Sequence, residues 1–218
     1  MKIVAIGDIH GQYQKLVWLM QKLERKSINF ENDLIIQLGD LVDGGPDTKR
    51  VVEYFIRQRN DYPKNWVVLK GNHEDMMLDA LRHKSLRYGS YYQWWNQGGA
   101  ETALSYGHVE AIDQGTLDWL EKLPTLVETP SFCFVHAGLR PDVPITSTPE
   151  IDRLWIRYEF LDSDYDWGKR VVAGHTYHVA PLVQKNKIVI DTMHHGHGVI
   201  TAAILDDRDG QLIEIVQA

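Results

Sequence analysis

The chain has 218 residues, which predicts one large domain over residues 1–218, and its 44% hydrophobic and 24% charged residues are ordinary for a globular protein. Its formal net charge of −7 argues against nucleic acid as a partner, because a phosphate backbone needs a basic surface. No apolar run approaches the roughly 18 residues of a membrane span and no secretion signal precedes the first strand, so we expect a cytoplasmic protein without a membrane partner.

The first patterned stretch runs from Lys2 to Gly11 and reads KIVAIGDIHG, which predicts a short buried strand that ends at Gly7. Asp8 and His10 follow on a turn at the carboxyl end of this strand, where open α/β sheets usually bind their ligands. Residues two apart in an extended segment point the same way, so this pair suits a divalent first-row metal. Alone, the pattern is equally typical of a turn aspartate beside a surface histidine.

The same arrangement recurs at the next two predicted strands. Residues 33–38 (DLIIQL) form a strand that leads into Asp40, and residues 66–69 form a strand that leads into Asn72 and His73. Because the carboxyl ends of successive strands in a βαβαβ unit meet, we expect these polar groups to lie together. Helices are predicted between the strands from apolar spacing, over residues 11–25, after Pro46 and after His73.

Two strands in the second half also end in histidine. Residues 132–135 lead into His136, and residues 171–173 lead into His175. Prolines mark a long loop between them, over residues 141–149. Further strands, which together predict a mainly antiparallel C-terminal half, fall at residues 182–184, 187–191, 199–205 and 212–216.

The middle of the chain, residues 88–106, is rich in aromatic residues and glycine. We expect these aromatic side chains to pack against the domain. The alternative is that they form a rim over the active site, where they could stack a base. Whether residues 84–106 form a mobile lid is left open by the sequence. A helix is predicted further on, over residues 115–123.

Six polar side chains at strand ends are thus expected to lie close together: two carboxylates, one amide and three imidazoles. They are too many for one tetrahedral ion, and they include no thiolate, which a structural zinc site usually has. They suit two octahedral or five-coordinate ions about 3.5–4 Å apart, which clamp the oxygens of a phosphoryl transfer and acidify a bridging water. The candidate ligands are Asp8, His10, Asp40, Asn72, His136 and His175.

The motifs GDIHG, GDLVD, GNHE, HAG and GHT occur in this order between residues 7 and 176. Together they resemble the calcineurin-like metallophosphoesterases, and more closely the phosphoprotein phosphatases in their compact bacterial and phage branch. WNQGGAET at 95–102 and LWIR at 154–157 match that branch as well. The resemblance implies a four-layer α/β/β/α sandwich with mixed sheets. It also implies two divalent metal ions, with manganese expected first and iron, zinc, magnesium or nickel as alternatives.

The resemblance implies a role for each matching residue. Asp8, His10 and His175 match ligands of one metal, Asn72 and His136 match ligands of the other, and Asp40 matches the carboxylate that bridges both. His73 matches the general acid that protonates the leaving oxygen, and Asp43 matches the carboxylate that orients it. Arg157 matches an arginine that contacts the phosphate, together with Asn72 and His73. The alternatives without a catalytic role are that Asp43 is a turn residue and that Arg157 is a surface or salt-bridged arginine.

The chain departs from the family pattern at Gly44, where the motif usually carries a second phosphate-binding arginine. Arg50 and Arg140 are the candidates to compensate, and we place Arg140 in the expected substrate-binding set. Loss of one such contact should weaken monoester binding by about 1.5–3 kcal/mol. It would also widen the site for diesters or other substrates.

By resemblance we expect a metal-dependent phosphoric ester hydrolase of the serine/threonine protein phosphatase type, in which a metal-bridging hydroxide attacks phosphorus directly. Its expected partners are phosphorylated proteins and small phosphomonoesters, and a monomer is the default assembly. The alternatives are a dinucleoside polyphosphate hydrolase, such as one for diadenosine tetraphosphate, or a general phosphodiesterase of the same superfamily. From another class, a catalytically silent metal-binding scaffold is disfavoured, because metal binding alone needs no proton donor at His73. The physiological substrate and the native metal pair are left open.

Overall fold

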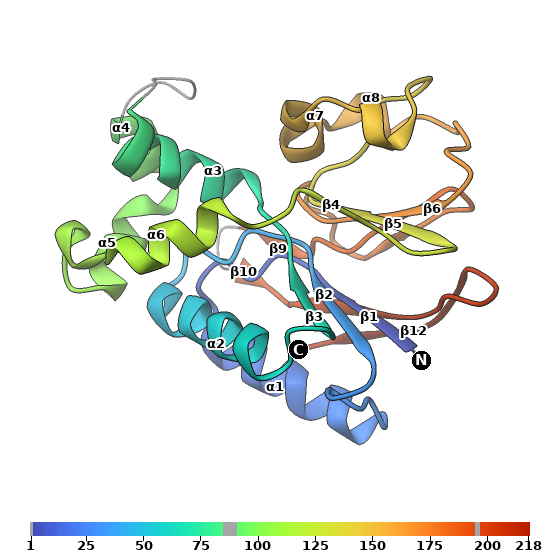
Figure 1. The fold of residues 1–218 in the computed structure, drawn as a ribbon, viewed down its shortest axis with the longest axis horizontal. Coiled ribbons are helices and arrows are strands. Elements are labelled where there is room, and N and C mark those ends of the chain that lie inside the picture. The colour runs from blue at the N-terminus through green and yellow to red at the C-terminus, as the bar shows by residue number, and fades with distance from the viewer. Residues whose placement is uncertain (1, 85–90, 195–196) are drawn as a thin grey trace.

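The computed structural model describes residues 2–84, 91–194 and 197–218, and two five-stranded sheets form its centre (Figure 1). The first sheet has the order β12-β11-β1-β2-β3, and the second has the order β4-β5-β6-β8-β7. The strands of the first sheet are β12 (Gln211–Gln217), β11 (Thr201–Asp206), β1 (Lys2–Ile6), β2 (Leu34–Gln37) and β3 (Trp66–Val68). Those of the second are β4 (Leu126–Glu128), β5 (Phe132–Val135), β6 (Arg170–Ala173), β8 (Lys187–Val189) and β7 (Leu182–Val183). A short ribbon of β9 (Met193–His194) and β10 (His197–Gly198) lies apart from both sheets.

The two sheets pack face to face, and the alternation of side chains along each strand decides which layer each residue enters. On β1, Ile3 and Ala5 enter the core between the sheets, where they join Phe134 and Ile188 of the second sheet. Val4 and Ile6 point to the other face of β1 and pack in the outer core. Each central strand is therefore buried on both faces, which explains why these strands read as continuous apolar runs.

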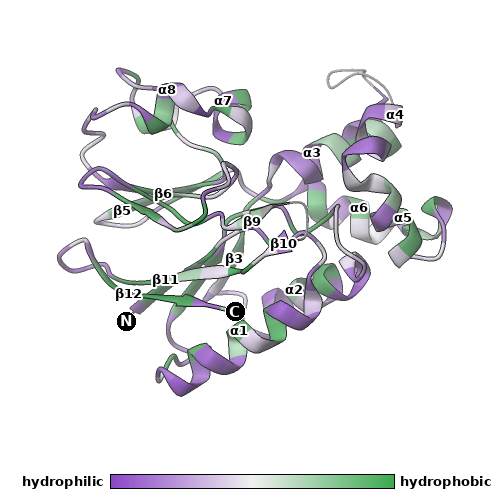
Figure 2. Cartoon of the chain, turned by 180° about the vertical axis from the view of Figure 1, so that it is seen from behind, coloured by the Kyte–Doolittle hydropathy of each residue, from purple (hydrophilic) through white to green (hydrophobic). Residues whose placement is uncertain are grey.

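Helices cover both outer faces, so the molecule has four layers, as the α/β/β/α expectation required (Figure 1). The first sheet is covered by α1 (Tyr13–Arg25) and α2 (Thr48–Asp61). Beside the sheets, a group of helices is formed by α3 (Asn72–Leu78), α4 (Tyr91–Trp94), α5 (Ala100–Ser105) and α6 (Gln114–Glu121) (Figure 1). The second sheet is covered by α7 (Glu150–Trp155) and α8 (Tyr158–Leu161), and α8 buries Phe160 fully. Figure 2 shows hydrophobic residues along the strands and hydrophilic residues on α1.

The second half is mainly antiparallel, as expected. Its antiparallel pairs include β4 with β5, β7 with β8, β9 with β10 and β11 with β12. The exception is the centre of the second sheet, where β5, β6 and β8 are parallel to one another. Parallel pairing needs long crossovers, and α7 and α8 lie in the one between β5 and β6. The proline-rich sequence there hid α7, which begins directly after Pro149.

This topology places the candidate site. Strands β1, β2 and β3 are parallel, as are β5, β6 and β8, so each set ends at one edge of its sheet. The two edges approach so closely that a Cβ on Gly174 would collide with the carboxylate of Asp8 on the other sheet. Among the described residues, no helix is long and apolar enough to cross a membrane. Of the stretch 84–106, residues 85–90 lie outside the described residues.

Candidate functional site

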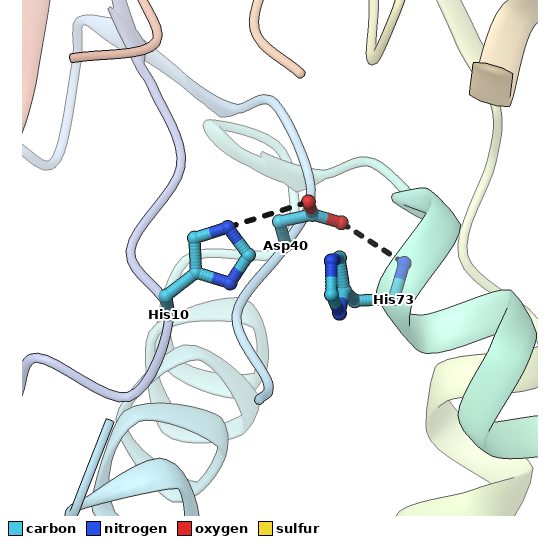
Figure 3. Close-up of side chains that lie close together, drawn as sticks. All are labelled: His10, Asp40 and His73. Carbon is cyan, nitrogen blue, oxygen red and sulfur yellow. Dashed lines mark hydrogen bonds and ion pairs between the residues drawn. The ribbon is translucent and has the colours of Figure 1, made fainter. Parts of the chain in front are cut away.

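The buried carboxylate of Asp40 lies between the side chain of His10 and the start of α3 at His73 (Figure 3). His10 Nε2, from the turn after β1, lies 3.6 Å from Asp40 Oδ2. His136 Nε2, from the turn after β5, lies 3.4 Å from Asp40 Oδ1. The backbone N–H of His73, at the start of α3, donates to Asp40 Oδ1 at 3.1 Å. Asp40 therefore connects groups from both sheets.

The remaining predicted ligands gather around Asn72. Its Oδ1 lies 2.8 Å from His136 Nε2 and 2.9 Å from His175 Nδ1. The backbone N–H of His175 donates to Asp8 Oδ2 at 3.0 Å. The structure thus brings together all six residues that the sequence predicted as ligands, and each of them is buried. Their role in holding metal stays a prediction.

The orientation of the imidazoles fits divalent metal ions. His10 Nδ1 lies 3.1 Å from the carbonyl of Val42, and His136 Nδ1 lies 2.8 Å from the carbonyl of Leu38, which leaves the Nε2 atoms facing Asp40. The Nε2 atom of His175 is buried without a hydrogen-bond partner. A buried nitrogen without a partner is costly unless something else, such as a cation, binds it.

The charges also fit a cation. Burial lowers the pKa of His10 to about 4 and holds the pKa of His136 and His175 below the ordinary value, so all three rings are neutral and can bind metal. Burial, with the nearby charges of Asp191 and Asp40, raises the pKa of Asp8. Burial likewise raises the pKa of Asp191 to about 7. Bound divalent ions would reverse this penalty on the carboxylates.

Two groups of described residues offer ligand atoms close enough for one ion each. The first is His10, Asp40 and His73, and the second is Asp40, His136 and His175. Asp40 belongs to both, as a bridging carboxylate would. His73 belongs to the first group only, and its ring also has a carboxylate partner in Asp43. Metal binding and proton donation are therefore competing roles for this ring.

The His73–Asp43 pair is held by a buried network. His73 Nδ1 lies 2.9 Å from Asp43 Oδ2. Thr102 Oγ1 donates to Asp43 Oδ1 at 2.7 Å, and Trp94 Nε1 donates to the same oxygen at 3.1 Å. Burial opposes a charge on His73, but the carboxylates of Asp40 and Asp43 outweigh it and raise the pKa of His73 to about 9. His73 is therefore protonated at neutral pH, as a proton donor must be.

The arginines separate into one that faces the site and two that do not. Arg157 lines a cavity of about 310 Å³, together with His10, Asp40, Asn72 and His73. Arg140 instead forms two hydrogen bonds with Asp152, at 2.6 and 2.8 Å, and Arg50 lies over the ring of Tyr13. Among the described residues that line the cavity, Arg157 is the sole arginine or lysine. The side chains at 50 and 140 thus do not replace the arginine missing at Gly44.

A larger hollow of about 690 Å³ lies where β5 and β6 begin, at the ends opposite the ligand groups. Its lining includes Lys169 and Arg170 but none of the six predicted ligands. The smaller cavity is therefore the candidate active site, since candidate metal ligands and His73 line it and do not line the larger hollow.

Glu74 is a functional residue that the sequence reasoning missed. It is fully buried, and its carboxylate accepts the backbone N–H groups of Gly71, Asp40 and Leu41 at 2.7, 2.9 and 2.7 Å. These bonds fasten the turn after β2 to the start of α3. The GNHE motif carried the signal, but its last residue has no reason in sequence alone to reach a turn 34 positions away.

Several site residues have a left-handed backbone. The φ angles of His10, Asp40, Asp43 and His175 are 45°, 56°, 68° and 63°. Such angles are uncommon for residues other than glycine and persist where surrounding contacts over-determine them. The hydrogen bonds of Glu74 supply such contacts for Asp40. This strain places side chains from tight turns toward one point.

The chain belongs to the calcineurin-like phosphoesterase family, which it matches over residues 1–205. It is 28% identical over 146 residues to serine/threonine-protein phosphatase 1 of Salmonella typhimurium, covering 66% of this chain and 60% of that protein. It is 31% identical over 140 residues to serine/threonine-protein phosphatase PP1-delta of Caenorhabditis elegans, covering 64% and 40%. It is 27% identical over 149 residues to the symmetrical bis(5'-nucleosyl)-tetraphosphatase of Neisseria meningitidis, covering 67% and 47%. The matched regions thus span 40–60% of these relatives' lengths.

Solved structures share the fold over nearly the whole chain. A structure described as that of an inferred diadenosine tetraphosphatase superposes with a TM-score of 0.73 at 22% identity, covering 100% of this chain and 93% of that one. The cold-active protein-tyrosine phosphatase of a psychrophilic Shewanella species gives a TM-score of 0.65 at 20% identity, covering 99% and 80%. These likenesses confirm the fold, and the family match places the chain in the metallophosphoesterase superfamily.

Metal addition should stabilise the protein, because the buried carboxylates and neutral imidazoles are poorly satisfied without it. We expect Mn²⁺ at 100 times its dissociation constant to add about 2.7 kcal/mol per occupied site to the free energy of unfolding. Calorimetric titration of metal-stripped protein should give two ions per chain, and His175→Ala and Asp40→Asn should each lower the affinity. His108→Ala, on the surface, is the matched control. Absence of both heat and a rise in melting temperature would contradict the metal assignment.

Proposed function

We propose that this chain is a dinuclear-metal-dependent phosphatase that hydrolyses phosphomonoesters, with phosphoserine and phosphothreonine side chains of proteins as its principal substrates. The observation that best supports this proposal is the contact of His73 Nδ1 with Asp43 Oδ2 at 2.9 Å. His73 also lines the same cavity as Arg157 and several of the candidate metal ligands. A metal-binding scaffold would not need a buried, oriented proton donor. The serine/threonine phosphatase relatives support this substrate class.

The candidate ligands are Asp8, His10, Asp40, Asn72, His136 and His175. Two divalent ions, with manganese proposed first, would supply positive charge for the phosphate oxygens and an acidified water as nucleophile. Arg157 contributes the charge that the chain itself offers to those oxygens, and a guanidinium can bind two of them at once. His73 donates a proton to the leaving oxygen, so that the alcohol departs neutral, and Asp43 holds the imidazolium in place.

The second candidate is a dinucleoside polyphosphate hydrolase. It is supported by the tetraphosphatase from Neisseria meningitidis among the relatives. Gly44 and the cavity's sole arginine also favour it, because a site with fewer phosphate contacts discriminates less strongly for a terminal monoester. The same ligands and the same proton donor would serve both reactions.

Competing substrates distinguish the two candidates. Metal-stripped enzyme supplied with Mn²⁺ should hydrolyse a phosphoserine peptide with a higher kcat/KM than diadenosine tetraphosphate. Faster hydrolysis of the dinucleotide would transfer the assignment to the second candidate. If neither is hydrolysed, both candidates fail.

Substitutions of the pair should separate proton donation from binding. His73→Asn should lower kcat for phosphoserine about 10²- to 10⁴-fold, and much less for 4-nitrophenyl phosphate, whose leaving group needs no proton. Asp43→Asn removes a carboxylate that raises the pKa of His73, so the alkaline limb of the kcat–pH profile should move to lower pH. His108→Asn is the control for the first change. An equal loss for both substrates would contradict the role of His73 as acid.

A further inference from the structure

Two tyrosines line the candidate active-site cavity without a role in the chemistry above. Tyr158 and Tyr177 both belong to its lining, and they are 70% and 41% exposed. Both positions lie outside the motifs on which the site prediction was built. An exposed tyrosine needs no explanation by itself, but two in the wall of one cavity place aromatic side chains beside whatever enters it.

Both tyrosines are tied in sequence to the phosphate-facing arginine. Tyr158 directly follows Arg157, and Tyr177 directly follows Thr176. The Arg157 guanidinium joins the two segments, because its Nη1 donates to the carbonyl of His175 at 3.2 Å and to Thr176 Oγ1 at 3.3 Å. A phosphoryl group held by Arg157 would therefore lie next to the segments that carry Tyr158 and Tyr177.

The backbones that carry the two rings are fixed. Tyr158 begins α8, whose Phe160 is fully buried in the outer core. On the other segment, His178, the neighbour of Tyr177, donates its backbone N–H to the carbonyl of Asp191 at 3.0 Å. Side chains on anchored backbone lose less conformational entropy on binding than those on free loops.

The described part of the aromatic stretch, residues 91–106, contributes no aromatic side chain to the cavity lining, and Gln97 is its one lining residue. Its Trp94 is only 2% exposed, and the ring nitrogen donates to Asp43. Trp94 therefore packs inside the domain, and the two tyrosines of the cavity come from the second sheet's side.

We propose that Tyr158 and Tyr177 form a subsite for a planar aromatic ring that the phosphoester itself carries. This inference rests on the proposed function, since Arg157 must hold the phosphoryl group for the ring to reach the tyrosines. The shared chemistry is ring stacking, and two sources provide it: the phenol of an aryl phosphate such as phosphotyrosine, and the base of a nucleoside polyphosphate. A ring in this subsite would tighten binding of the phosphoester that carries it, while phosphoserine and phosphothreonine remain the principal substrates proposed for the same site.

Inhibition by two non-hydrolysable phosphonates tests the subsite separately from leaving-group reactivity. Phenylphosphonate and methylphosphonate carry the same charged group, and only the first carries a ring. Tyr158→Ala and Tyr177→Ala should each weaken inhibition by phenylphosphonate about three- to tenfold and leave methylphosphonate unchanged. Tyr158→Phe, which keeps the ring, should behave as the wild type. Tyr92→Ala, at an exposed tyrosine outside the cavity lining, is the matched control.

The outcomes separate this inference from the proposed function. If the wild type hydrolyses a phosphoserine peptide with Mn²⁺ but binds both phosphonates equally, the subsite is overturned and the proposed function stands. If the alanine variants weaken inhibition by both phosphonates to the same extent, the subsite is also overturned. If the wild type hydrolyses no phosphoester, the proposed function fails first.

The source of the ring is then assigned with two substrates. A drop in kcat/KM of Tyr158→Ala for a phosphotyrosine peptide alone identifies an aryl phosphate. A drop for diadenosine tetraphosphate alone identifies a nucleobase. No drop for either contradicts the subsite.

Discussion

The carboxylate of Asp40 connects the two sheets of this protein. It stands at the end of β2 with a left-handed backbone, 3.6 Å from His10 of the same sheet and 3.4 Å from His136 of the other. Glu74 fixes its turn by binding the backbone N–H of Asp40 itself. Burial keeps the rings of His10, His136 and His175 neutral around it and raises the pKa values of the nearby Asp8 and Asp191 carboxylates. The packing that brings these groups together therefore offers a place where cations could bind.

Much of the site was predictable because each ligand sits at the end of a recognisable strand. A glycine followed by a polar group after β1, β2, β3 and β6, and a histidine directly after β5, predicted the six candidate ligands that the structure gathers. The four-layer fold followed from the resemblance that these motifs carry. The parallel order of β5, β6 and β8 was not predictable in this way, because short apolar strands carry no mark of direction.

The supporting contacts were hidden for a different reason. Thr102 and Trp94 reach Asp43 across 59 and 51 positions in the sequence. Neither residue type suggests such a role, and the aromatic stretch that contains Trp94 predicted packing at best. Only the folded chain shows that this packing also fixes Asp43, the partner of the proposed proton donor His73. Contacts that hold such a group in place join residues far apart in the sequence, whereas the candidate ligands could be identified from local pattern.

The most direct test of the account is the position of the metals relative to His73. Crystals grown with Mn²⁺ and phosphate, measured at the manganese absorption edge, should give two anomalous peaks, one on each side of the Asp40 carboxylate. We expect His10 at one peak and His136 at the other, with the His73 ring still bound to Asp43 and turned toward the phosphate. A single peak, or a peak ligated by the His73 ring, would contradict it.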